Sequence, residues 1–157
     1  MPLDLDDEKA IDYSSNIPFL PFEALGDYVL DILSYEEHEG HNGDGDLVTV
    51  QVVETDNATI RAGEKYVFYF RTDIKGDGKA FAAARLRSFV RAAVGVAESE
   101  ARTFEANPAR KALLAEDLSK GGNLIRLSRR SKPAKKGTKH EGKEFCEDFW
   151  KVADKAA

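Results

Sequence analysis

Basic side chains are concentrated in one segment of this chain, where they could neutralise phosphate groups. Between residues 126 and 143 the sequence has eight Lys or Arg residues and one acid, Glu141, which gives a local charge of +7. The net charge of the chain is −5, so the remaining residues carry −12. A cationic segment within an acidic protein can bind a nucleic-acid backbone locally, while the acidic remainder repels duplexes that approach elsewhere.

The pattern of this segment predicts how its cations are presented. NLIRLSRRSK, over residues 123–132, is typical of a strand, in which successive side chains alternate between two faces. The sequence KEFCEDFWKV, over 143–152, predicts a partner strand after the loop PAKKGTKHEG. We expect six cations to contact phosphates: Arg126, Arg130 and Lys132 from one face of the first strand, and Lys135, Lys136 and Lys139 from the loop.

Aromatic side chains supply the second device that binds single strands, because a base stacked on an aromatic ring contributes about 1 to 3 kcal/mol. KYVFYFRT, over 65–72, predicts an aromatic-rich strand. Tyr66, Phe68 and Phe70 share one face of it, and we assign them to the core. Tyr69 and Arg71 then face outward, Tyr69 to stack a base and Arg71 to border that surface.

The last predicted strand offers a further stacking residue. Phe145 and Phe149 face away from Cys146 and Trp150, and the sequence leaves open which set lies in the core. We expect Phe145 to stack a base beside Tyr69.

Periodicity along the chain predicts an α+β, mainly β fold. Strands are expected over 27–35, 46–55, 65–72, 123–132 and 143–152, and helices within 80–96 and 109–120. Three strands, a helical excursion and a final hairpin make the order of a five-stranded OB-type barrel, whereas a ferredoxin-like domain would need a helix between the first two strands. We expect an acidic, irregular arm over 1–25, one OB-type domain over 26–152 and a short tail over 153–157.

The helical excursion has its own signals. Gly95 predicts the end of the first helix, and Asn107 with Pro108 predicts the start of the second. Arg87 and Arg91 lie opposite the apolar stripe of the first helix, so we expect both to face solvent. The sequence leaves open whether a short helix lies between these two helices.

Residues that could carry catalysis form no recognisable constellation. Asp44 and Asp46 in HNGDGD lack the spacing of a calcium-binding loop, so we expect a solvated turn within a hairpin loop over 36–46. The three histidines, His38, His41 and His140, are expected on the surface. The single cysteine and the acidic start predict a cytoplasmic protein that is neither exported nor embedded in a membrane. We expect no enzyme activity and no cofactor.

Several sequence segments resemble those of a family of small phage-encoded single-stranded DNA-binding proteins with an OB core. They are LGDYVLDI, LVTVQVVETD after a glycine-rich loop, AGEKYVFYF, SFVRAAVGV and KKGTKHEGKEF before Trp150, and they span roughly residues 24–152. The resemblance implies sequence-tolerant binding of single strands in phage replication, recombination or repair, with no catalytic cofactor. We expect single-stranded DNA as the partner, in the host cytoplasm if the protein is viral, with replication or recombination proteins and further copies of the chain as additional partners.

Two other functions remain open from the sequence. The acidic body favours an OB-type protein-interaction module that binds a host or replication partner. A small nuclease is the more distant alternative.

Overall fold

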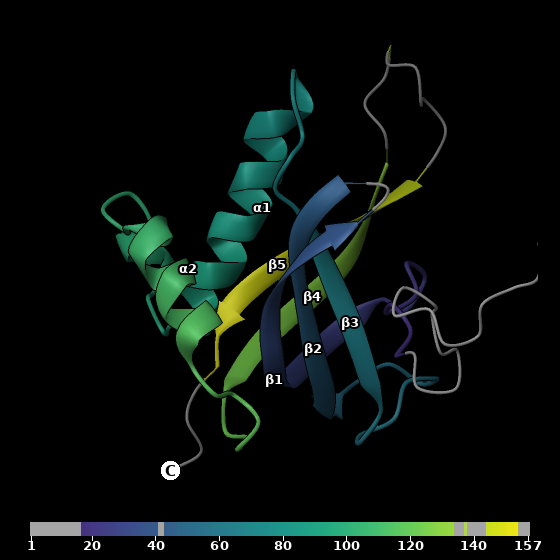
Figure 1. Ribbon diagram of the computed structural model, residues 1–157. Helices are drawn as coiled ribbons and strands as arrows, with labels where there is room; N and C mark the ends of the chain where they lie inside the picture. Colours follow the sequence, from purple (N-terminus) through teal and green to yellow (C-terminus); the bar gives the residue numbers. More distant parts are fainter. Residues whose placement is uncertain (1–16, 41–42, 134–136, 138–143, 154–157) are drawn as a thin grey trace, which may run out of the picture.

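The computed structural model describes residues 17–40, 43–133, 137 and 144–153. Its strands are β1 (Gly26–Gly40), β2 (Gly43–Thr55), β3 (Lys65–Arg71), β4 (Leu124–Pro133) and β5 (Glu144–Val152). The helices α1 (Gly78–Ala93) and α2 (Ala106–Ala115), with a 3-10 turn at Glu98–Glu100, follow β3 and precede β4 in the sequence (Figure 1). The protein is therefore mainly β, with the helical excursion where the sequence predicts it. No helix in the described ranges is long and apolar enough to cross a membrane.

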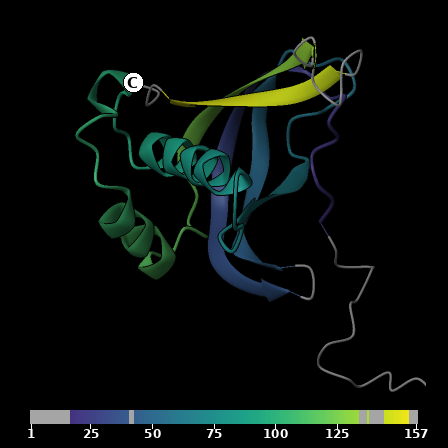
Figure 2. The ribbon, with the colours of Figure 1, turned by 90° about the horizontal axis from the view of Figure 1, so that it is seen from above.

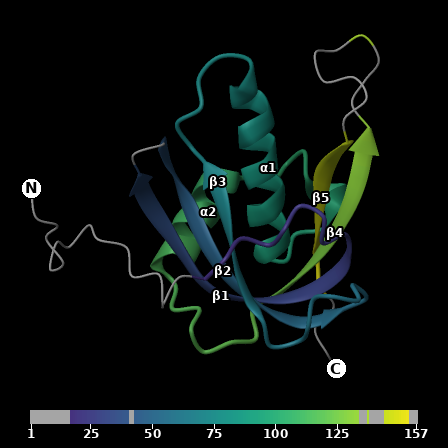
Figure 3. The same cartoon turned by 90° about the vertical axis from the view of Figure 1, so that its right-hand side faces the viewer.

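All five strands belong to one antiparallel sheet in the order β3-β2-β1-β4-β5. The sheet curves around α1, but its two edge strands, β3 and β5, are not paired with each other in the described part of the chain (Figure 3). Helix α1 stands at this opening, between β3 and the β4–β5 ribbon (Figures 2 and 3). The sheet is thus rolled but not closed into a barrel.

The first hairpin corrects one prediction. The loop expected over residues 36–46 is mostly strand, because pairing of β1 with β2 continues out to Gly40 and Gly43. Glycine is needed here for close approach, since a side chain on Gly45 would lie 2.5 Å from the carbonyl oxygen of Phe70. The glycines that indicated a loop therefore allow close packing around the β1–β2 ribbon.

The core lies between the inner face of the sheet and α1. The three β3 aromatics assigned to the core, Tyr66, Phe68 and Phe70, are all buried. Trp150 of β5 joins them: its ring centroid lies 5.1 Å from that of Phe68 and 4.9 Å from that of Phe89 on α1. These aromatic contacts join β3 to β5 where no backbone hydrogen bonds do.

An N-terminal segment, residues 17–25, crosses the gap between β3 and β4 (Figure 3). Phe19 forms a parallel bridge with Val67 on the edge of β3, and Leu20 and Ala24 are buried in the core. Arg129 of β4 donates hydrogen bonds to the carbonyl oxygens of Leu20 (3.1 Å) and Pro21 (2.6 Å). The described part of the predicted arm is therefore fastened to the domain.

The prediction that Arg87 and Arg91 face solvent is wrong. Arg91 is 5% exposed and donates to the carbonyl oxygens of Val96 (2.6 Å) and Trp150 (3.3 Å). Arg87 is half-buried and donates to two carbonyl oxygens of the following segment, at 2.6 Å each. Guanidinium groups carry five donors, so they can satisfy carbonyl groups that no helix or strand pairs.

The prediction of a solvated turn at Asp46 is also wrong. Asp46 is fully buried, accepts a hydrogen bond from the Tyr35 hydroxyl (2.5 Å) and forms a bidentate ion pair with Arg110 of α2, at 2.6 Å for both contacts. Helix α2 begins at Ala106, two residues before the predicted Pro108 start, and Arg110 attaches it to the first hairpin. This ion pair, rather than turn chemistry, explains the acid at position 46.

Candidate nucleic-acid interface

The outer face of the sheet, which points away from α1, presents the basic residues of β4. Ile125, Leu127 and Arg129 point inward and are buried. Strand alternation therefore places Arg126, Arg130 and Lys132 together on the outer face, where all three are exposed. The prediction that these three cations share one face is confirmed.

Strand β5 adds two outward residues that the sequence analysis did not select. Trp150 is buried and Phe149 is 44% exposed, which settles the facing of this strand. In the register, Phe149 lies opposite Ser128, and Lys151 lies opposite Arg126. The signal for both was the alternation along EDFWKV: once the tryptophan is assigned to the core, its two neighbours must face outward.

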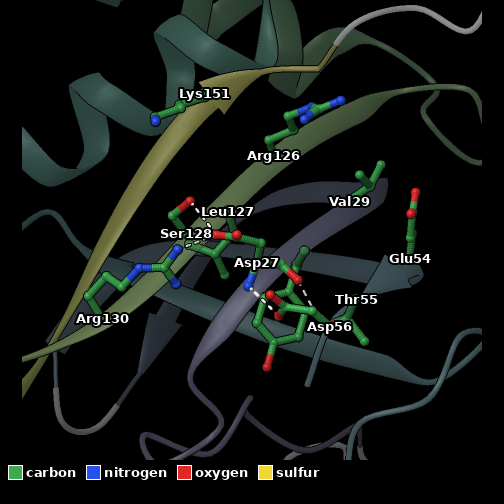
Figure 4. Close-up of a pocket in the computed structure, with 11 residues that line it drawn as sticks. Asp27, Val29, Glu54, Thr55, Asp56, Arg126, Leu127, Ser128, Arg130 and Lys151 are labelled. Atoms are coloured by element: carbon green, nitrogen blue, oxygen red, sulfur yellow. Dashed lines mark hydrogen bonds and ion pairs between the residues drawn. The ribbon is translucent and has the colours of Figure 1, made fainter. Parts of the chain in front are cut away.

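Cross-strand pairing extends these residues into two rows, one across four strands and one across three. One row runs from Lys151 through Arg126 and Val29 to Glu54, since each residue is the register partner of the next. The adjacent row runs from Phe149 through Ser128 to Asp27. Most of these residues line a shallow depression of about 510 Å³ over β1, the end of β2, β4 and β5 (Figure 4).

Charges of both signs meet in this depression. Arg130 pairs with Asp27 at 2.7 Å, and beside it Lys132 pairs with Glu147 at 3.4 Å. Hydrogen bonds from Ser128 and Arg130 lower the pKa of Asp27 below its ordinary value. Because these side chains are exposed, water and salt weaken the pairs, and an incoming phosphate can replace a carboxylate.

Cations and carboxylates from different strands line the depression. Arg126 and Lys151 lie on β4 and β5, whereas Glu54 lies at the end of β2, on the far side of Val29, and Asp56 follows β2 beside Asp27 (Figure 4). Val29, Thr55 and Ser128 also line the depression. The arrangement can hold a ligand with an anionic side and a side rich in hydrogen-bond donors.

Tyr69 and Arg71 occupy a different part of the outer face. They lie on β3, which β2 and β1 separate from β4 in the sheet order. The Tyr69 hydroxyl donates to the carbonyl oxygen of Gly43 (2.7 Å), and Arg71 forms an ion pair with Asp73 at 2.8 Å. Asp73 in turn accepts a hydrogen bond from the backbone N–H of Asp44 (2.8 Å), so both side chains support the first hairpin, and the structure does not bring them beside the β4–β5 ribbon.

The remaining predicted site residues cannot be placed in this way. Lys135, Lys136 and Lys139 lie outside the described residues. The backbone of Phe145 pairs with Lys132, but its side chain is also outside the described part. Their roles stay predictions.

No three His, Cys, Asp or Glu side chains in the described ranges are grouped so that they could hold a metal ion. The sequence matches no protein-family model. It also matches no curated protein.

Proposed function

We propose that this protein is a non-enzymatic, OB-type single-stranded DNA-binding protein that acts in phage-type replication, recombination or repair. The observation that carries the proposal is Phe149, an aromatic side chain 44% exposed in the middle of a strand and flanked by cations of the same outer face. A large apolar ring beside exposed cations fits a ligand that has both flat bases and phosphates.

The topology gives independent support. An OB barrel has a five-stranded sheet in which the first strand pairs with the fourth and a helix lies between the third and fourth strands. In this chain β1 pairs with both β2 and β4, and α1 lies between β3 and β4. An OB-type fold is therefore the finer assignment that we favour for this open sheet.

Phosphates would contact the exposed cations of this face, Arg126, Arg130, Lys132 and Lys151, and would replace partners that these side chains already have, such as Asp27 at Arg130 and Glu147 at Lys132. Phe149 would stack a base. The loop lysines at 135, 136 and 139, which continue from the ends of β4 and β5, would extend the cationic path. Each phosphate neutralised on a single strand contributes about −0.7 to the slope of log affinity against log salt.

The deciding experiment is fluorescence anisotropy with a labelled 30-base oligo-dT and a matched duplex, at low and moderate salt. We expect salt-sensitive preference for the single strand, lost in the variant Arg126→Glu/Lys151→Glu. The control Lys111→Glu/Lys120→Glu changes the net charge equally at exposed positions on and after α2. Absence of binding at micromolar protein, or equal loss in both variants, would overturn the proposal.

A second candidate function is an OB-type protein-interaction module. Phe19 and Phe22 in the N-terminal segment are 63% and 77% exposed, which is unusual for neighbouring large aromatics. Absence of single-strand binding, together with a partner that a Phe19→Ser/Phe22→Ser variant fails to bind, would favour this function.

A further inference from the structure

We propose that Glu54 makes the depression selective for bases that carry an exocyclic amine, so that cytosine-rich single strands bind more tightly than thymine-rich ones. This inference rests on the proposed function and goes beyond it, because a purely stacking and phosphate-binding surface would distinguish these bases only weakly.

A β-bulge turns Glu54 toward the site. Val48, Val50 and Val52 point inward, so an uninterrupted β2 would direct Glu54 inward as well. Leu30 pairs with Val52, however, while Val29 pairs with Glu54, which leaves Val53 as an extra residue in β2. Val29 faces outward between two buried neighbours, and its partner Glu54 therefore faces outward too. Bulges re-aim side chains in this way and are over-represented beside functional sites.

The position of Glu54 relative to the cations suits the reading of a base. Arg126, Val29 and Glu54 are consecutive in one cross-strand row, so the backbones of the two charged residues lie two strand spacings, or about 10 Å, apart. One nucleotide can span such a width, with its phosphate at Arg126, its base over Val29 and its base edge at Glu54. Figure 4 shows Arg126, Val29 and Glu54 in this order.

The carboxylate of Glu54 is also available. It is exposed and has no hydrogen-bond or ion-pair partner among the described residues, whereas Asp27 and Asp56 already accept hydrogen bonds. An ionised carboxylate only accepts hydrogen bonds. It therefore favours the N4 amine of cytosine and is repelled by the O4 oxygen of thymine at the same position.

The test compares 30-base oligo-dC with 30-base oligo-dT by anisotropy at pH 7.5. These probes share a backbone and a pyrimidine ring, so the ratio of their Kd values isolates the base edge. We expect at least about fivefold tighter binding of oligo-dC, as one good carboxylate-to-amine contact provides. In Glu54→Gln the ratio should fall to within about twofold of unity, with oligo-dT binding tightened by the loss of a negative charge.

Glu98→Gln is the matched control, because it removes the same charge from an exposed position in the 3-10 turn and should leave the ratio unchanged. Equal affinities of the wild type for both probes, or a ratio that persists in Glu54→Gln, would overturn this inference while leaving single-strand binding intact. Failure of the wild type to bind either probe would instead reject the proposed function and this inference together.

Discussion

Arg129 and Asp148 form a bidentate ion pair inside the protein, with contacts of 2.7 and 3.0 Å between adjacent strands. Their side chains are only 4% and 9% exposed. The guanidinium group also lies over the ring of Phe68 and binds the N-terminal segment. One arginine thus connects β3, β4, β5 and the segment that crosses the open side of the sheet.

Breaking this pair from one side should destabilise the protein strongly. We expect Arg129→Met to lower the free energy of unfolding by about 3 to 5 kcal/mol, because Asp148 is left as a buried, unpaired charge. Urea denaturation measures the change. The matched control is Arg130→Met, which removes an exposed pair of the same 2.7 Å length and should cost less than about 1 kcal/mol. Equal losses in the two variants would show that burial does not set the strength of these pairs.

Replacing Phe149 by Ala should weaken single-strand binding through lost stacking. The expected loss is about 1 to 3 kcal/mol, or roughly five- to 150-fold in Kd, and it should persist at high salt because stacking releases no counterions. Anisotropy at two salt concentrations measures it. Phe22→Ala removes the same ring from a more exposed position off the β4–β5 ribbon and should leave Kd unchanged. A loss that disappears at high salt would argue against stacking.

In the proposed function Asp27 competes with phosphates for Arg130, so we expect Asp27→Asn to strengthen binding. The additional phosphate contact should steepen the salt slope by up to about 0.7. Asp117→Asn is the control, since Asp117 is also exposed and bonded to a serine but lies after α2. An unchanged slope in Asp27→Asn would mean that Arg130 does not contact phosphate.

The same pair predicts a lack of pH response. Because the pKa of Asp27 is lowered, its carboxylate remains charged well into the acidic range, and its stabilising bonds are lost only as pH falls through that lowered value. Lowering the pH from 7 to 5 should therefore not release Arg130 from Asp27. The effect of this pair on the affinity for single strands should stay constant over that range.

Cys146 should react slowly as a thiol. Burial, together with the nearby Asp148 carboxylate, raises the pKa of Cys146 to about 11. The rate of its alkylation by iodoacetamide should therefore keep rising beyond pH 10 in the folded protein, whereas in urea the rate should level off above about pH 9. The unfolded thiol ionises first, so this group's contribution to stability is lost as pH rises from about 8.5 to 11. A plateau near pH 9 in the folded protein would contradict the prediction.

Local periodicity was enough to predict most of the sheet. Alternation identified the buried aromatics of β3 and the shared face of Arg126, Arg130 and Lys132, because each follows from the geometry of a single strand. The helix end at Gly95 was also predictable, since its φ of +82° follows directly after α1.

Buried charges were not predictable in the same way. Asp46 and Arg110 are 64 residues apart, and Arg129 meets carbonyl groups more than 100 residues away. A local pattern counts such residues as solvated, because it contains no information about distant partners. The bulge at Val53 could not be predicted for a related reason, because a register shift depends on both paired strands.

The hydrogen bonds from Arg129 to the N-terminal segment also affect how the protein folds during synthesis. Leu20 and Pro21 leave the ribosome long before the arginine that holds their carbonyl groups, and Asp148 follows later still. Until then the early meander β1–β2–β3 has no fourth strand on β1 and an incomplete cover on the edge of β3. Nascent chains of this protein should therefore depend on chaperones or on fast elongation to avoid edge-to-edge association, and they should resist proteases only after β5 has emerged.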